Sequence, residues 1–379
     1  MTAVEGYARA PWALPAAVVA ILVALALNFR NRREPVGIDF HTYAAAARVG
    51  LEQGWSHIYD QALVAVQQKL LVPGEVAQPF ISPPTVAWLA AAVRPLPYEA
   101  SFYIWAALTL AAFAGALAWS ASSRGAVRWI LVVAAVAPWW VLEAVRVGQV
   151  VPLVAAGVAI AWRLLREDRN VAAGLALSLV LLKPNTAFMV PFALLVAGRL
   201  RTFATMLAVG AVLAIVALLT VGGDGVFAYL SQLAGPLPRG GDSLTLERGL
   251  GIRGPAISVL RVIIVVAVLA AAFRLRRSPG FVLVVGILGS LVAIPYLHAS
   301  DLCLLAVAAL IVWEERPTSA WRVPLVAGWL LASPYPGMIR LGLPLDRWPL
   351  IELVFLAGML AMAWQLGRAR PRGQVVGVP

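Results

Sequence analysis

Long apolar runs, separated by short polar stretches, recur from one end of this chain to the other. Of its 379 residues, 61% are hydrophobic, whereas a soluble domain is closer to half apolar. The runs are about 15 to 20 residues long, which is the length of helix that crosses a bilayer. The sequence therefore predicts an all-α polytopic membrane protein whose residues 1–379 form a single transmembrane domain.

The formal charge of +12 raises the question of nucleic acid binding. The basic residues, however, lie mainly between the apolar runs, where a membrane protein uses them to fix its orientation. We therefore expect the lipid bilayer, and no nucleic acid, as a partner. The chain has one cysteine, Cys303, which excludes a disulfide or a multi-thiolate metal site within the chain.

The apolar runs predict about twelve transmembrane helices. Their approximate ranges are 11–28, 99–119, 128–144, 148–164, 171–183, 186–198, 202–221, 254–273, 280–296, 297–313, 321–334 and 349–366.

Arginines occupy alternate short loops between these ranges, and the positive-inside rule assigns those loops to the cytoplasm. With both termini cytoplasmic, the count of crossings is consistent only if 83–94 does not cross. Its apolar core of nine residues would reach only ~14 Å as a helix, so we interpret it as a shallow or re-entrant helix. The arginines are Arg124, Arg128, Arg163, Arg166, Arg169, Arg199, Arg201, Arg274, Arg276, Arg277, Arg316, Arg322, Arg368, Arg370 and Arg372.

Two long loops then face the outside of the plasma membrane. The first spans 29–98 and contains two short surface helices, Ala44–Leu51 and Gln61–Leu71. The second spans 222–254, and its glycines and prolines predict irregular structure.

Polar side chains within or beside apolar spans are costly and are usually functional. Under this topology they gather on the outer side. They predict a polar cavity with one candidate base, Asp39, and several cations. The candidate substrate-binding residues are Lys183, His298, Arg146, Gln149, His41, Tyr43, Arg253 and Asp301, and Arg340 lies in the last outer loop.

Seven of these residues also have a structural interpretation. Asp39 is a suitable N-cap for a helix over 40–49, and Gln149 is a suitable cap for the next span. Lys183 and Arg146 can reach the headgroups by extending their side chains. Structural pairing explains His298 with Asp301, and an interfacial aromatic belt explains Tyr43.

A lone carboxylate among cations at a membrane face suits group transfer from an anionic lipid carrier. The carboxylate would accept a proton from an attacking hydroxyl, and the cations would stabilise a departing phosphate. The sequence shows no Walker A motif, no dinucleotide fingerprint after a strand, no HExxH and no DxD pair. We therefore expect no metal and no cofactor.

Four segments form a recognisable pattern, namely GIDFHTYAAAARVGLEQGWSHIYD at 37–60, QPFISPPTVAWLAAAVRPLP at 78–97, GQVVPLVAAGVAI at 148–160 and AAGLALSLVLLKPNTAFMVPFALL at 172–195. In this order they resemble the membrane glycosyltransferases of family eighty-seven, which include mannosyltransferases dependent on polyprenyl-phosphate-mannose. The chain departs from the family pattern at Ser82, where the family has Tyr.

This resemblance implies a C-type glycosyltransferase fold that transfers a sugar from a polyprenyl monophosphate to a glycan or glycolipid acceptor, with inversion. Asp39 matches the catalytic base, Lys183 a contact to the donor and His298 a polar residue of the active site. Mannose is the expected sugar. The alternatives are an arabinofuranosyl or other pentosyl transferase and, in a different class, a lipid-carrier transporter or flippase.

Overall fold

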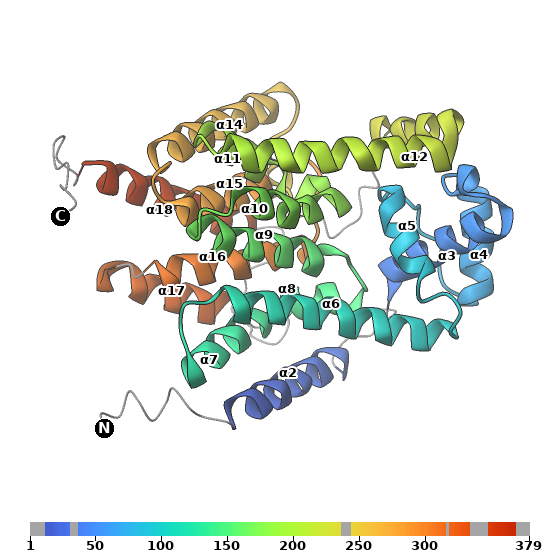
Figure 1. Ribbon diagram of the computed structural model, residues 1–379, viewed down its shortest axis with the longest axis horizontal. Coiled ribbons are helices and arrows are strands. Elements are labelled where there is room, and N and C mark those ends of the chain that lie inside the picture. Colours follow the sequence, from blue (N-terminus) through green and yellow to red (C-terminus); the bar gives the residue numbers. More distant parts are fainter. Residues whose placement is uncertain (1–11, 31–36, 236–243, 316–317, 334–347, 369–379) are drawn as a thin grey trace.

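The computed structural model describes residues 12–30, 37–235, 244–315, 318–333 and 348–368 (Figure 1). Throughout these ranges the regular elements are helices, which confirms the predicted all-α class. Three charged residues of the predicted outer loops lie outside the described residues. They are Arg239 and Asp242 in the second loop and Arg340 in the last one.

The helices follow one another along the described chain, with short 3-10 helices labelled η. They are α2 (Ala13–Arg30), α3 (Ile38–Gln53), η1 (Trp55–His57), α4 (Gln61–Leu71), α5 (Pro84–Ala91), α6 (Tyr98–Ser120), α7 (Gly125–Val136), α8 (Trp139–Arg146), α9 (Val151–Arg166), α10 (Asn170–Leu177), η2 (Ser178–Leu182), η3 (Pro184–Ala187), α11 (Met189–Val196), α12 (Leu200–Ala234), α13 (Leu246–Leu250), α14 (Pro255–Arg274), α15 (Pro279–Ala293), η4 (Ala299–Leu302), α16 (Cys303–Glu314), α17 (Ser319–Ala332) and α18 (Trp348–Arg368).

A helix occupies each of the twelve predicted ranges, but far fewer helices are long enough to cross a bilayer alone. Within the described residues three helices are both long and apolar enough, α6, α12 and α14. The pair α7 and α8 makes a fourth if it is one span, bent by 68°. The other apolar helices are shorter, so the structure does not confirm twelve spans.

Helix α15 forms the centre of the bundle. It is apolar on every side and buried from Gly280 to Ala293, as expected of a helix surrounded by other helices. It packs against α9, α11, α14, α16 and α18. By contrast, the large side chains of α12 and α14 that face outward, such as Leu219 and Val262, are apolar and exposed. Such a surface suits contact with lipid.

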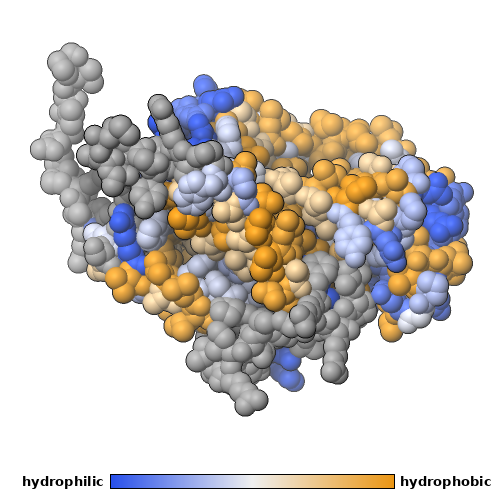
Figure 2. Space-filling model, turned by 90° about the horizontal axis from the view of Figure 1, so that it is seen from below, coloured by the Kyte–Doolittle hydropathy of each residue, from blue (hydrophilic) through white to orange (hydrophobic). Residues whose placement is uncertain are grey.

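The first predicted loop is a folded unit at one end of the molecule. Helices α3, α4 and α5 pack together there, at the right of Figure 1, and hydrophilic residues gather at the same end in Figure 2. Helix α4 has the predicted bounds. Helix α5 has eight residues and therefore rises only ~12 Å, too short to span the ~30 Å hydrocarbon core.

Two local predictions about the loops were wrong. Asp39 does not precede its helix as an N-cap, because α3 begins at Ile38 and its N-cap is Gly37. The second outer loop is not irregular from its start, because α12 breaks at Gly222 and then continues as helix to Ala234. The break needs a positive φ of 75°, which glycine adopts readily.

Helix α9 connects two chemically different ends of the bundle. Its C-terminal end lies among arginine contacts: Arg163 donates to the Trp119 carbonyl and Arg166 to the Ser122 hydroxyl, while nearby Arg199 pairs with Asp168. Its N-terminal end, Val151, lies two residues after Gln149. Sixteen helical residues separate these ends, about 24 Å along the helix axis. The arginine-rich loops and the candidate site are thus well separated.

Candidate active site

The start of α3 is fixed to the end of α8 by backbone hydrogen bonds. The Gly37 N–H donates to the Arg146 carbonyl at 2.8 Å, and the N–H groups of Asp39 and Phe40 donate to the Val147 carbonyl at 2.9 and 3.1 Å. The first N–H groups of a helix have no partner inside it, so α8 supplies these partners. The contact fixes the position of Asp39 relative to the turn that follows α8.

Two glycines make this close contact possible. Gly37 and Gly148 have φ of 77° and 75°, a region that disfavours other residues. A Cβ on Gly148 would also lie 2.5 Å from the Cβ of Phe40. The Trp105 indole N–H then donates to the Gly148 carbonyl at 2.9 Å, which holds the turn from the α6 side.

Asp39, Gln149 and Tyr43 form a chain of hydrogen bonds. The Gln149 amide Nε2 donates to Asp39 Oδ2 at 3.0 Å, and the Tyr43 hydroxyl donates to Gln149 Oε1 at 3.0 Å. Tyr43 and Gln149 are buried. Because the ionised carboxylate only accepts and the amide has one donor end, the pattern fixes the orientation of the Gln149 side chain and aims its N–H at the acid.

Asp301 is the centre of a second group of contacts. Its Oδ1 accepts from Lys183 Nζ at 2.6 Å and from the Thr186 hydroxyl at 3.1 Å, and its Oδ2 accepts from the backbone N–H of His298 at 2.9 Å. Asp301 is fully buried, whereas the Lys183 side chain is 13% exposed. A buried charge needs such partners to be tolerated. Asp301 therefore fixes the position of the Lys183 ammonium.

The two groups act on each other electrostatically. Burial raises the pKa of the Asp39 carboxyl above its usual range. Electrostatic interactions with Lys183 and His298 and the hydrogen bond from Gln149 lower this pKa in part, and the charge of Asp301 raises it again. A carboxylate in this setting is a stronger base than one in water. Segments around residues 39, 149, 183 and 298–301 thus come together in one site.

The structure also gives the surroundings of three further predicted site residues. His41 is fully buried, with its Nε2 2.7 Å from the Gln68 carbonyl and its Nδ1 3.5 Å from Glu75, which places its ring among the helices of the first loop. Arg146 makes a two-bond ion pair with Glu143 at 2.9 and 2.7 Å inside α8. Arg253 is exposed in the turn before α14.

Other residues of the site were not selected from sequence. Thr186 follows Lys183 in the quoted segment LLKPNT and shares its partner Asp301. The ring of Tyr296 lies 4.7 Å from that of His298, edge to face. The only sequence signal for these two residues was their closeness to a predicted site residue. Thr186 is three positions from Lys183 and Tyr296 is two positions from His298, in segments without regular helical periodicity. Within the described residues no three His, Cys, Asp or Glu side chains are grouped to hold a metal ion.

Comparison with protein families gives one match. The family model for glycosyltransferase family 87 matches residues 80–334, about two thirds of the chain. Neither the curated proteins nor the solved structures that were compared give a match. The matched range contains Gln149, Lys183, His298 and Asp301 but begins after Asp39. Since the match covers more than half of the chain, the protein belongs to glycosyltransferase family 87 and is a membrane glycosyltransferase.

Proposed function

We propose that this enzyme transfers a sugar, mannose by preference, from a polyprenyl monophosphate to a glycan or glycolipid at the extracytoplasmic face. Asp39 is the general base. The observation that carries the proposal is the position of its carboxylate, bonded to Gln149 and within electrostatic range of Lys183 and His298. A base beside a cation is the arrangement that displacement of a phosphate needs.

The reaction is a single displacement. As the acceptor oxygen forms its bond to the anomeric carbon, the hydroxyl proton passes to Asp39. The bond between that carbon and the phosphate oxygen breaks, and its electron pair leaves with the polyprenyl phosphate. Attack from the face opposite the leaving group inverts the anomeric carbon. The raised pKa of Asp39 favours this role because a stronger base accepts the proton more readily.

Lys183 stabilises the charge that develops on the departing phosphate. Its ammonium group has three N–H donors, one of which is used by Asp301. The remaining donors are available to phosphate oxygens. Because Asp301 and Thr186 fix the geometry beforehand, little reorganisation is needed when charge develops, which is the condition for electrostatic catalysis.

The topology that accompanies this proposal has both termini in the cytoplasm and Asp39 outside. The arginine-rich turns at the far end of α9 support it, since cytoplasmic loops carry an excess of arginine. A lipid-linked donor also suits this face, because the bilayer itself holds the donor beside the site.

The donor is tested with purified protein and two radiolabelled substrates, polyprenyl-phosphate-mannose and polyprenyl-phosphate-arabinose. We expect acceptor-dependent consumption of the mannose donor. Consumption of the arabinose donor alone would establish the pentosyl alternative. If neither donor is consumed with any glycan or glycolipid supplied, the proposal of a polyprenyl-phosphate donor is wrong.

Lys183→Ala tests the phosphate contact. We expect it to reduce kcat/KM for the donor by at least about a hundredfold, because removing one donor to a developing oxyanion costs that much. The only other lysine, Lys69, is exposed at the end of α4, so Lys69→Ala is the matched control and should act like wild type. Equal donor kinetics for both variants would exclude Lys183 from phosphate binding.

A further inference from the structure

A pocket separate from the candidate active site lies within the folded first loop. Its volume is about 380 Å³, and it is bounded by α3, the end of α4 and the turn between α5 and α6. The lining residues are Phe40, Ala44, Arg48, Leu71, Ala90, Val93, Arg94, Pro95, Leu96, Pro97, Tyr98 and Ser101.

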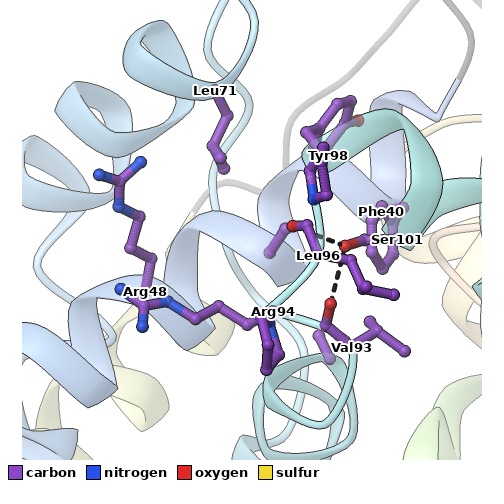
Figure 3. Close-up of a pocket in the computed structure, with 12 residues that line it drawn as sticks. Phe40, Arg48, Leu71, Val93, Arg94, Leu96, Tyr98 and Ser101 are labelled. Atoms are coloured by element: carbon purple, nitrogen blue, oxygen red, sulfur yellow. Dashed lines mark hydrogen bonds between the residues drawn. The ribbon is translucent and has the colours of Figure 1, made fainter.

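The pocket combines apolar walls with two arginines on one side. Figure 3 shows the guanidinium groups of Arg48 and Arg94 across from Phe40, Tyr98 and Ser101. On the opposite wall the Ser101 hydroxyl already has a hydrogen-bond partner, because it donates to the Val93 carbonyl at 2.8 Å. A ligand that fits therefore has one anionic group and an apolar remainder.

The charge of the pocket is positive even after its own ion pairs are counted. Arg48 and Arg94 both pair with the same carboxylate, that of Glu52. One acid neutralises one of the two guanidinium charges, and each arginine has five N–H donors. Each arginine donates one N–H to Glu52, from Nε of Arg48 and from Nη2 of Arg94. Phosphate oxygens match such paired arginines well.

The pocket lies at the end of a helix that can cross the membrane. Tyr98 and Ser101 belong to the first turn of α6, one of the three helices that are long and apolar enough to span. Leu96 at the pocket mouth is exposed, as are Tyr103 and Ile104 on the next turn of α6. An apolar surface thus continues from the pocket along the lipid-facing side of α6, where acyl chains would lie.

The pocket is distinct from the site at Asp39. On α3 the pocket residues are spaced four apart, Phe40, Ala44 and Arg48, whereas Asp39 and Tyr43 occupy the neighbouring face. The Phe40 ring lines the pocket and packs against Trp105 and Phe102.

We propose that this pocket binds an anionic phospholipid, one with no positive charge in its headgroup, with the phosphate between Arg48 and Arg94 and the acyl chains along α6. Binding would anchor the first loop to the outer leaflet through the helix that carries Asp39. This inference concerns lipid binding and does not depend on which sugar is transferred.

The test is direct binding of short-chain phosphatidylglycerol to purified full-length protein, with phosphatidylcholine and inorganic phosphate as separate arms. We expect phosphatidylglycerol to bind at least tenfold more tightly than either of the other two. The double variant Arg48→Gln/Arg94→Gln should lose at least tenfold in that affinity. The control Arg169→Gln/Arg201→Gln removes the same charge from exposed positions at the other end and should bind as wild type does.

A second variant keeps both charges and removes the space. Ala44→Phe places a ring inside the pocket, and we expect it also to weaken binding of phosphatidylglycerol at least tenfold. The proposal can therefore still be tested if the arginine variant misfolds. Equal affinity in wild type and in a folded pocket variant overturns the proposal, as does inorganic phosphate binding as tightly as the lipid. The same measurements on Asp39→Asn keep this outcome separate from any failure of the proposed transfer.

Discussion

At the scale of single residues, the site depends on two opposing influences on the pKa of Asp39. Burial raises the pKa of Asp39, and the amide of Gln149 partly opposes that rise by donating to the charged form. Tyr43 in turn fixes the amide so that its N–H, and not its carbonyl, faces the acid. In the proposed mechanism Gln149 and Tyr43 are therefore positioning residues, and Asp39 alone exchanges the proton.

Gln149→Leu should shift the pH dependence of kcat/KM. Losing a hydrogen bond that favours the carboxylate raises the pKa of Asp39 further, so activity should begin to fall at a higher pH on the acid side, by about one unit. Tyr43→Phe leaves the amide donor in place and should shift the profile less. An unchanged acid limb in Gln149→Leu would mean that the amide does not tune this acid.

At the scale of elements, the critical contact is between the start of α3 and the turn after α8. Three backbone hydrogen bonds join them, and Phe40 packs directly against Gly148. Asp39 is on the first element and Gln149 on the second, so the bond between their side chains depends on this close approach.

Gly148→Ala should disrupt this contact. An alanine with positive φ costs about 1 kcal/mol, and the added Cβ would also collide with Phe40, so we expect about 3 kcal/mol or more in total. The control is Gly198→Ala, which has φ of 84° and nothing within 4 Å of the new Cβ. Thermal unfolding in detergent should show the larger loss for Gly148→Ala, together with lost transfer. Similar losses for both variants would show that close packing at Gly148 is unimportant.

At the scale of the whole molecule, two ends of a helical bundle have different chemistry. One end has the folded first loop and the candidate site, and the other has arginine-rich turns, with α9 running from one to the other. The outer surfaces of α12 and α14 between them are apolar. A bilayer around that apolar zone would place the two ends on opposite sides of the membrane.

Labelling with a membrane-impermeant maleimide tests this orientation. Gln53→Cys, exposed at the end of α3, should react in intact cells, whereas Arg169→Cys should react only after lysis. The native Cys303 is buried and should remain unlabelled. Labelling of position 169, and not of position 53, in intact cells would reverse the proposed topology.

The sequence was most informative about charged residues beside apolar helices, because such residues are energetically costly there. Asp39, Lys183 and Asp301 were selected because charge is rare beside apolar helices, and they do lie near one another. The apolar runs also predicted helices in the right ranges. The sequence did not predict the start of α3 just after Gly37, because that start depends on tertiary partners, the Arg146 and Val147 carbonyls. His41 was grouped with the site by loop position alone, which does not say which way a side chain points, and its ring lies among the helices of the first loop.

The central claim, that Asp39 is the base, is tested most directly by the rate of sugar transfer in Asp39→Asn. Asparagine keeps the shape and accepts from Gln149, but it cannot take the proton. We expect transfer to fall by at least about a hundredfold, while the affinity for the polyprenyl-phosphate donor stays within about threefold of wild type. Transfer near the wild-type rate, with donor binding intact, would contradict the account.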